Sequence, residues 1–264
     1  GLLVPFETAL KVEARWAVKL LNKPSTFNMI NTLFVNKTAL DKGLARPKKI
    51  ESQKTRKVGV IGAGMMGSGI AYVSAIANIE VVLVDATEDK ANQGKSKVKL
   101  ILEEGIRRRK TTADQMEAVL QRITATNDYS CLKEVDLVIE AVFEDASLKK
   151  EVTKLAETHI SKSTIFATNT STLPVSDLAK VSKNQSNFIG IHFFSPVNKM
   201  NLVEVIKSEQ TNEKSLAVSL DYISLIKKTP IVVNDSRGFY ANRCIIPYIN
   251  EGLRMLSEGI EPAL

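Results

Sequence analysis

The stretch that decides the fold is KVGVIGAGMMGSGIAYVSAIANIEVVLVDA, residues 57–86. Its apolar start, KVGVIG, is typical of a buried strand, GMMGSGIAYVSAIA is typical of a helix, and IEVVLVDA predicts a second strand. A strand, a crossover helix and a second strand form the unit from which parallel sheets are built. Strand and helix patterns keep alternating to about residue 236, which predicts an α/β fold with a doubly wound, mostly parallel sheet of Rossmann type.

The turn between the first strand and the helix has the glycine spacing of a dinucleotide-binding loop. Gly62 permits the tight turn, Gly64 lets the backbone approach a pyrophosphate, and Gly67 lets the helix pack closely on the strand. The first N–H groups of the helix are then free to bind phosphate. Asp85 ends the second strand, 18 residues past Gly67, where a carboxylate binds ribose hydroxyls and repels a 2′-phosphate. We therefore expect NAD, not NADP, as the cofactor.

The sequence on either side of this region has a different character. Apolar residues recur three and four apart over residues 5–42, which predicts helices, and the lysine-rich stretch 42–57 has the composition of a connector. Residues 238–258 predict a helix with no strand after it. The expected organisation is a helical linker segment (1–47), a basic connector (48–56), a Rossmann domain (57–236) and the start of an all-α C-terminal domain (237–264).

The composition excludes several functional classes. The chain is 44% hydrophobic and 25% charged, which is typical of a globular protein, and no apolar run approaches the roughly 18 residues that span a bilayer. Cys131 and Cys244 form neither a disulfide framework nor a metal-binding spacing, which favours a reducing compartment. The net charge of +7 is compatible with polyanions, but no nucleic-acid-binding motif is present. We expect no metal, no transmembrane segment and no nucleic-acid partner.

The stretch GIHFFSPVNKMNLVEV, residues 190–205, places a histidine and an acid in apolar surroundings. His192 ends a predicted strand, where open α/β sheets bind ligands, and its imidazole could take the proton of an alcohol while hydride passes to a nicotinamide. Glu204, on the next strand, could orient the ring. Spacing alone leaves open a core histidine and a surface glutamate on an edge strand. His159 lies near a helix end and is given no catalytic role.

Five motifs in order resemble the 3-hydroxyacyl-CoA dehydrogenase family: KVGVIGAGMMGSGIA, DLVIEAVFED, FATNTSTLPVS, GIHFFSPVNKMNLVEVI and VVNDSRGFYANR. The likeness is to the dehydrogenase portion of multifunctional fatty-acid β-oxidation proteins, in which an enoyl-CoA hydratase domain comes first and residues 1–47 resemble the joining segment. It implies NAD-dependent oxidation of (S)-3-hydroxyacyl-CoA to 3-oxoacyl-CoA. It also implies that the chain is a fragment, which we expect to be weakly active by itself.

The same resemblance implies roles for individual residues. His192 matches the catalytic base and Glu204 its acidic partner. The implied cofactor-binding residues are Gly62, Gly64, Met66, Gly67, Asp85, Val142, Phe143, Glu144, Lys149, Ser171 and Ser195. The implied substrate-binding residues are Ser171, Asn242 and Arg108, the last from a basic segment that approaches coenzyme A in the family. Ser195 stands where many relatives have asparagine.

Two other functions stay open at this point. One is a β-hydroxyacid dehydrogenase for a small carboxylate, although such families usually employ a catalytic lysine instead of a histidine and glutamate. The other is a non-catalytic NAD-binding or assembly module. The resemblance further implies a homodimer or a complex with a thiolase subunit, and a location in the bacterial cytoplasm.

Overall fold

The chain divides into two compact units, Gly1–Leu44 and Ala45–Leu264, and the computed structural model describes residues 3–262. The first unit consists of α1 (Phe6–Leu21), α2 (Pro24–Ile30), the π-helical segment η1 (Asn31–Asn36) and α3 (Lys37–Asp41). The helices predicted over residues 5–42 are thus confirmed. Pro24 accounts for the break after α1, because proline cannot continue a helix but fits the first turn of the next one.

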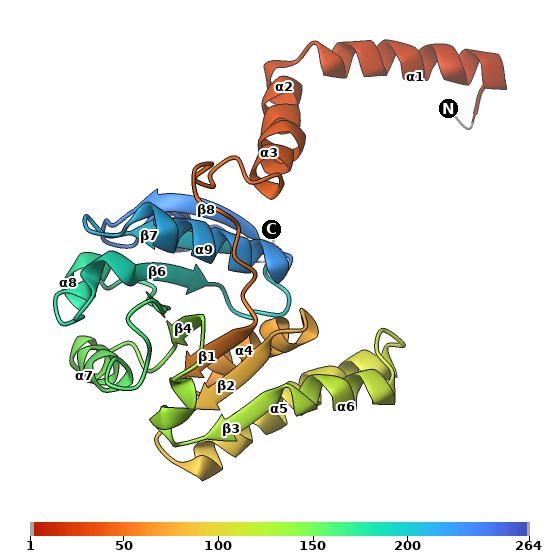
Figure 1. Ribbon diagram of the computed structural model, residues 1–264. Coiled ribbons are helices and arrows are strands. Elements are labelled where there is room, and N and C mark those ends of the chain that lie inside the picture. The colour runs from red at the N-terminus through yellow and green to blue at the C-terminus, as the bar shows by residue number, and fades with distance from the viewer. Residues whose placement is uncertain (1–2, 263–264) are drawn as a thin grey trace. The chain divides into compact units, whose positions relative to one another are not determined.

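In the described part of the chain, the second unit is built on one sheet of eight strands, in the order β3-β2-β1-β4-β5-β6-β7-β8 (Figure 1). Neighbours from β3 to β6 in this order are parallel, β7 is antiparallel to β6, and β8 is parallel to β7. The mostly parallel sheet is therefore confirmed. The strands are β1 (Lys57–Ile61), β2 (Glu80–Val84), β3 (Ile123–Thr126), β4 (Leu137–Glu140), β5 (Ile165–Thr168), β6 (Phe188–Phe193), β7 (Leu202–Lys207) and β8 (Thr229–Asn234).

Helices cover both faces of the sheet. Side chains alternate along each strand, so Val60 joins one apolar cluster with α4, α5, α6 and α9, while Ile61 joins a second cluster with α7 and α8. This is the doubly wound arrangement that the sequence predicts. The helices are α4 (Met65–Ile76), α5 (Glu88–Arg107), α6 (Ala113–Gln121), α7 (Ala146–Ala156), α8 (Val175–Ala179), α9 (Glu213–Leu225) and α10 (Ala241–Ser257), with 3-10 turns η2 (Tyr129–Leu132) and η3 (Gln185–Asn187).

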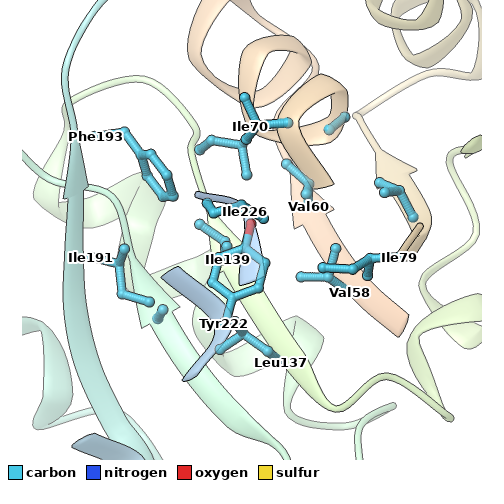
Figure 2. Close-up of a cluster of buried hydrophobic side chains, with 14 of the residues drawn as sticks. Val58, Val60, Ile70, Ile79, Leu137, Ile139, Ile191, Phe193, Tyr222 and Ile226 are labelled. Carbon is cyan, nitrogen blue, oxygen red and sulfur yellow. The ribbon is translucent and has the colours of Figure 1, made fainter. Parts of the chain in front are cut away.

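The first cluster holds the glycine-rich helix α4 on the sheet (Figure 2). Val58 and Val60 of β1 and Ile70 of α4 are fully buried there. Tyr222 of α9 is also fully buried, and its hydroxyl forms a 2.8 Å hydrogen bond with the hydroxyl of Ser74 in α4. A buried polar group needs such a partner, so this bond and the apolar contacts together fix the position of α4.

The carboxyl ends of the parallel strands meet at one edge of the sheet. β1 lies between β2 and β4, so the winding of the chain reverses there, and open α/β sheets bind ligands in the crevice at such a reversal. The loops that follow β1, β4, β5 and β6 begin at this edge and carry seven of the residues singled out by sequence: Gly62, Gly64, Val142, Phe143, Glu144, Ser171 and Ser195.

The last described helix, α10, matches the helix predicted over residues 238–258, and none of its side chains is buried. Within residues 3–262, no helix combines the length and the apolar character needed to cross a membrane. In the same range no group of three or more histidine, cysteine, aspartate or glutamate residues is placed to hold a metal ion.

Candidate active site

The glycine loop after β1 has the geometry of a phosphate-binding turn. Gly62 has a φ of 100°, which favours glycine, and a Cβ on Gly67 would lie 1.7 Å from the carbonyl oxygen of Gly62. Both positions therefore require glycine. A Cβ on Gly64 would meet no atom within 4 Å, which leaves open space at the N-terminus of α4. A dinucleotide pyrophosphate fits this cradle, because its oxygens can accept the free N–H groups.

Asp85 lies directly after β2, beside the same loop. Its Oδ2 accepts a 2.7 Å hydrogen bond from the N–H of Ala63, and its Oδ1 accepts one of 2.7 Å from the N–H of Ala86. These bonds fix the carboxylate next to the glycine turn. It is therefore placed where a carboxylate binds the adenine ribose of a dinucleotide.

His192 and Glu204 are direct partners across the antiparallel pair β6 and β7. Their side chains project from the same face, and Nδ1 of His192 lies 2.7 Å from Oε2 of Glu204. Because a carboxylate can only accept, the neutral imidazole carries its hydrogen on Nδ1 and its lone pair on Nε2. His192 is 6% exposed, and it lines a cavity described below, so its ring can serve as a base there.

Glu204 is fully buried, and β8 pairs with the other side of β7. The open alternative of a surface glutamate on an edge strand is therefore wrong. The second oxygen of Glu204, Oε1, accepts hydrogen bonds from the N–H groups of Tyr240 (3.0 Å) and Ala241 (2.8 Å), where α10 begins. The first N–H groups of a helix lack partners within it, so Glu204 both orients His192 and fixes the start of α10.

These contacts keep Glu204 ionised. Burial by itself would raise the pKa of Glu204, but the hydrogen bond from His192 and those from the N–H groups of Ala241 and Tyr240 outweigh it, and the pKa is lowered. A buried carboxylate with three hydrogen-bond donors, one of which is the imidazole of His192, is a stable counter-charge for imidazolium.

This lowered pKa predicts a pH dependence of folding. A carboxylate whose pKa is lower in the folded state stabilises the fold above its unfolded pKa, and this stabilisation is lost as pH falls through the folded pKa. The free energy of unfolding should therefore decrease as pH falls below about 4.3, the ordinary pKa of glutamate. We expect a smaller decrease in Glu204→Gln, measured by chemical denaturation between neutral and acidic pH. Glu151→Gln, at an exposed glutamate, is the control, and equal decreases in all three proteins would contradict the prediction.

A second buried network lies behind the loops that follow β4 and β5. Nζ of Lys149, in α7, lies 2.8 Å from Oε1 of Glu140 and 3.4 Å from Oε2 of Glu144. Glu140 also accepts hydrogen bonds from the N–H of Val142 and the hydroxyl of Thr168. Glu140 and Lys149 are fully buried or nearly so, and burial of such a pair is tolerated because each charge has close partners.

Glu144 extends this network to the loop that carries Ser171. Its Oε1 accepts hydrogen bonds from the hydroxyl of Thr170 (2.6 Å) and from the N–H groups of Ser171 (2.8 Å) and Thr172 (3.1 Å). Burial would raise the pKa of Glu144, but the bond from Thr170, the charge of Lys149 and the two N–H groups lower it. An ionised Glu144 therefore holds this loop in place.

A cavity of about 340 Å³ brings together six of the residues that the sequence singled out: Met66, Val142, Glu144, Ser171, His192 and Ser195. Its lining consists of Met66, Ala141, Val142, Glu144, Asn169, Ser171, His192, Phe193, Phe194 and Ser195. These residues come from α4 and from the loops or strand ends at β4, β5 and β6. The glycine loop, the imidazole and the Ser171 loop thus face one another at the carboxyl edge of the sheet.

Four further predicted residues do not line this cavity: Phe143, Asn242, Lys149 and Arg108. Phe143 is 81% exposed, and Asn242 in α10 donates a 2.7 Å hydrogen bond from its side chain to the carbonyl of Ser171. The ammonium of Lys149 is turned towards Glu140 and Glu144 and does not line the cavity. Arg108 follows α5, is exposed and pairs with Glu104. Contacts of Lys149 with the cofactor and of Arg108 with coenzyme A stay predictions.

Sequence reasoning missed the apolar lining residues Ala141, Phe193 and Phe194, and it also missed the polar residues Glu140 and Asn169. Glu140 is the one acid within the apolar run LVIEAV, residues 137–142, which is the same signal that singled out Glu204. Asn169 directly follows β5, and its side-chain oxygen accepts a 2.9 Å hydrogen bond from the N–H of Phe193, next to His192. An asparagine beside a strand end gives no such signal by itself.

Comparison with known proteins gives consistent matches. Residues 57–236 match the family model described as 3-hydroxyacyl-CoA dehydrogenase, NAD binding domain. The fatty acid oxidation complex subunit alpha of Pseudomonas syringae is 37% identical over 255 residues, which cover 97% of this chain and 35% of that protein. The corresponding subunit of Shewanella halifaxensis is 40% identical over 211 residues, 80% of this chain and 30% of that protein. The chain thus spans about a third of the length of these relatives.

Solved structures agree with these matches. The (S)-3-hydroxybutyryl-CoA dehydrogenase PaaH1 from Ralstonia eutropha is 37% identical and superposes with a TM-score of 0.77 over 80% of this chain and 75% of that one. FadB2 from M. tuberculosis is 33% identical, with a TM-score of 0.76 over 78% and 73% of the two chains. The dehydrogenase part of multifunctional enzyme 1 from C. elegans is 27% identical, with a TM-score of 0.69 over 84% and 54%.

Proposed function

Because the chain belongs to the 3-hydroxyacyl-CoA dehydrogenase family, we propose that it oxidises (S)-3-hydroxyacyl-CoA to 3-oxoacyl-CoA with NAD. The observation that carries this proposal is the buried pair of His192 and Glu204, whose imidazole lines a cavity beside the glycine loop. An alcohol dehydrogenase needs a base within reach of the hydroxyl and a dinucleotide beside the reacting carbon. Both requirements are met at the same edge of the sheet.

The cofactor is held by the loop after β1 and by Asp85. The open space at Gly64 and the free N–H groups of α4 would receive the pyrophosphate, and Asp85 would bind the adenine ribose. Met66, Val142 and Ser195 line the cavity and would face the nicotinamide. When bound, NAD accepts a hydride from the 3-carbon of the substrate.

His192 takes the proton of the substrate hydroxyl on Nε2, since Nδ1 is bonded to Glu204. Glu204 stabilises the imidazolium that forms, and its two bonds from the start of α10 prevent it from turning away. In the reverse direction the imidazolium returns this proton. The pair therefore works as base or acid, depending on substrate and product levels.

Ser171 and Asn242 position the substrate. Ser171 lines the cavity, where its hydroxyl, which donates a 3.1 Å hydrogen bond to Glu144, can contact the 3-oxygen. The bond from Asn242 to the carbonyl of Ser171 couples this loop to α10. Arg108, exposed at the end of α5, is assigned to the coenzyme A moiety, because a guanidinium suits phosphate. Lys149 does not act as a catalytic lysine in this scheme, because its ammonium is bonded to Glu140 and Glu144.

We assign the chain to a multifunctional fatty-acid oxidation protein, since its relatives named as alpha subunits are about three times longer. Residues 1–47 then join a hydratase domain to the dehydrogenase, with 48–56 as connector, 57–236 as the NAD-binding domain and 237–264 as the beginning of a helical domain. The proposed partners are a thiolase subunit or a second copy of the chain. The proposed location is the bacterial cytoplasm.

The direct test is NADH formation by the full-length gene product. We expect absorbance from NADH with 3-hydroxybutyryl-CoA and NAD, and a rate at least about tenfold lower with NADP, because Asp85 repels a 2′-phosphate. Free 3-hydroxybutyrate tests the alternative of a small-carboxylate dehydrogenase. No NADH with hydroxyacyl-CoA esters of any chain length would reject the proposal and favour a non-catalytic NAD-binding module.

A further inference from the structure

Lys228 is a buried cation that the proposed reaction does not use. It lies between α9 and β8, and only 9% of its surface is exposed. Its ammonium donates hydrogen bonds to the carbonyls of Val197 (2.6 Å) and Met200 (2.5 Å). No ion pair joins it to a carboxylate within residues 3–262. Burial of an ammonium is costly unless it has strong partners. The carbonyls of Val197 and Met200 are these partners for Lys228.

The backbone at the end of α9 places the side chain of Lys228 in the protein interior. α9 ends with the N–H of Lys228 bonded to the carbonyl of Ile223 and the N–H of Lys227 bonded to that of Ser224, which is the Schellman pattern of helix ends. Lys227 occupies the left-handed position, with a φ of 59°, where glycine is usual and a side chain introduces strain. The residue after this left-handed position commonly makes an apolar contact with the helix, but in this chain it is Lys228.

The segment that Lys228 holds is the loop between β6 and β7, residues 194–201. It begins two residues after His192, and it carries Ser195 to the cavity. Val197 is buried and packs on Gly69 of α4, where an added Cβ would lie 2.8 Å from Cβ of Val197. Ser195 also donates a hydrogen bond from its hydroxyl to the sulfur of Met65. The loop therefore contacts both the cavity and the first half of the cofactor helix.

We propose that Lys228 is a positioning residue that fixes the 194–201 loop, and through it Ser195 and α4, in the geometry that binds NAD. Burial lowers the pKa of Lys228, so burial opposes its charged form, and the two carbonyl acceptors offset this cost. A neutral side chain of similar size would fill the same space, but it would leave the carbonyls of Val197 and Met200 without donors. The loop would then move more freely, while the core around α9 stayed packed.

The effect on the loop is measured by hydrogen exchange without cofactor. The N–H groups of Lys199 and Met200 both donate to the carbonyl of Pro196, so their exchange reports on this turn. In Lys228→Met we expect their exchange to be about tenfold faster or more, the factor that corresponds to one hydrogen bond to a charged group. Lys228→Arg keeps a charged donor and should restore part of the protection. Unchanged exchange in Lys228→Met overturns the proposal.

A matched control separates this effect from a general loss of stability. Thr164→Val removes another buried hydrogen bond, 2.9 Å from the hydroxyl of Thr164 to the carbonyl of Val135, before β5 and away from the cavity. This variant should become less stable without faster exchange at Lys199 and Met200. Equal acceleration in both variants would mean that only global stability had changed, and it would also overturn the proposal.

The effect on cofactor binding rests on the proposed function and is measured by NADH affinity. We expect Lys228→Met to bind NADH about tenfold more weakly, Lys228→Arg to recover part of the affinity, and Thr164→Val to bind normally. Normal NADH affinity in Lys228→Met with a loosened loop would overturn the link to the cofactor. No NADH binding by the unsubstituted protein would count against the proposed function instead, and hydrogen exchange would still decide the role of Lys228.

Discussion

Glutamine in place of His192 lowers kcat for hydroxyacyl-CoA oxidation by about 10²–10⁴-fold, the range for loss of a general base, and leaves NADH affinity unchanged. Glutamine can still form a hydrogen bond with Glu204, whose Oε2 lies 2.7 Å from the imidazole, so the packing between β6 and β7 is retained. It cannot take up a proton at neutral pH. Steady-state kinetics with NAD and 3-hydroxybutyryl-CoA, together with NADH titration, measure the two effects separately.

His159→Gln is the natural control, because His159 is the other histidine of the chain and lies after α7, next to the ring of Tyr129. It should retain the kcat of the unsubstituted protein. If His192→Gln also retained kcat, the base would have to be another group at the cavity, and Glu144 would be the next residue to replace.

Alanine in place of Gly67 strongly weakens cofactor binding. Its Cβ would lie 1.7 Å from the carbonyl oxygen of Gly62 and 2.9 Å from the carbonyl carbon, and both atoms belong to the backbone of the glycine turn. No side-chain rotation relieves this overlap, so α4 must move away from β1. We expect NADH binding to weaken at least about a hundredfold, with a loss of about 3 kcal/mol or more in the free energy of unfolding, as for severe overpacking.

Gly64→Ala is the paired variant, and it tests cofactor binding at the same glycine turn if Gly67→Ala fails to fold. Gly64 has a φ of −67°, which alanine tolerates, and the added Cβ meets no atom within 4 Å. The melting temperature should therefore stay the same. NADH affinity should still fall, because the methyl group occupies the space assigned to the pyrophosphate. Normal affinity in a folded Gly64→Ala protein would show that the phosphates do not approach this turn.

The sequence by itself determined the fold class and the place of the cofactor loop. Strand and helix periodicity, the glycines at 62, 64 and 67 and the acid at 85 act over a few residues or one βαβ unit, so they can be recognised without coordinates. The same holds for the helices predicted over residues 5–42 and for the mostly parallel sheet, both of which the structure has.

Only the tertiary structure decided which polar side chains meet. His192 and Glu204 are 12 residues apart, and their pairing depends on the register of β6 against β7. A one-residue slip of β7 would turn the side chain of Glu204 to the opposite face of the sheet, away from His192. The bonds from Tyr240 and Ala241 to Glu204 and from Lys228 to Val197 and Met200 join segments about 30 residues apart. Such contacts are set by how the layers pack, and local sequence patterns carry no information about them.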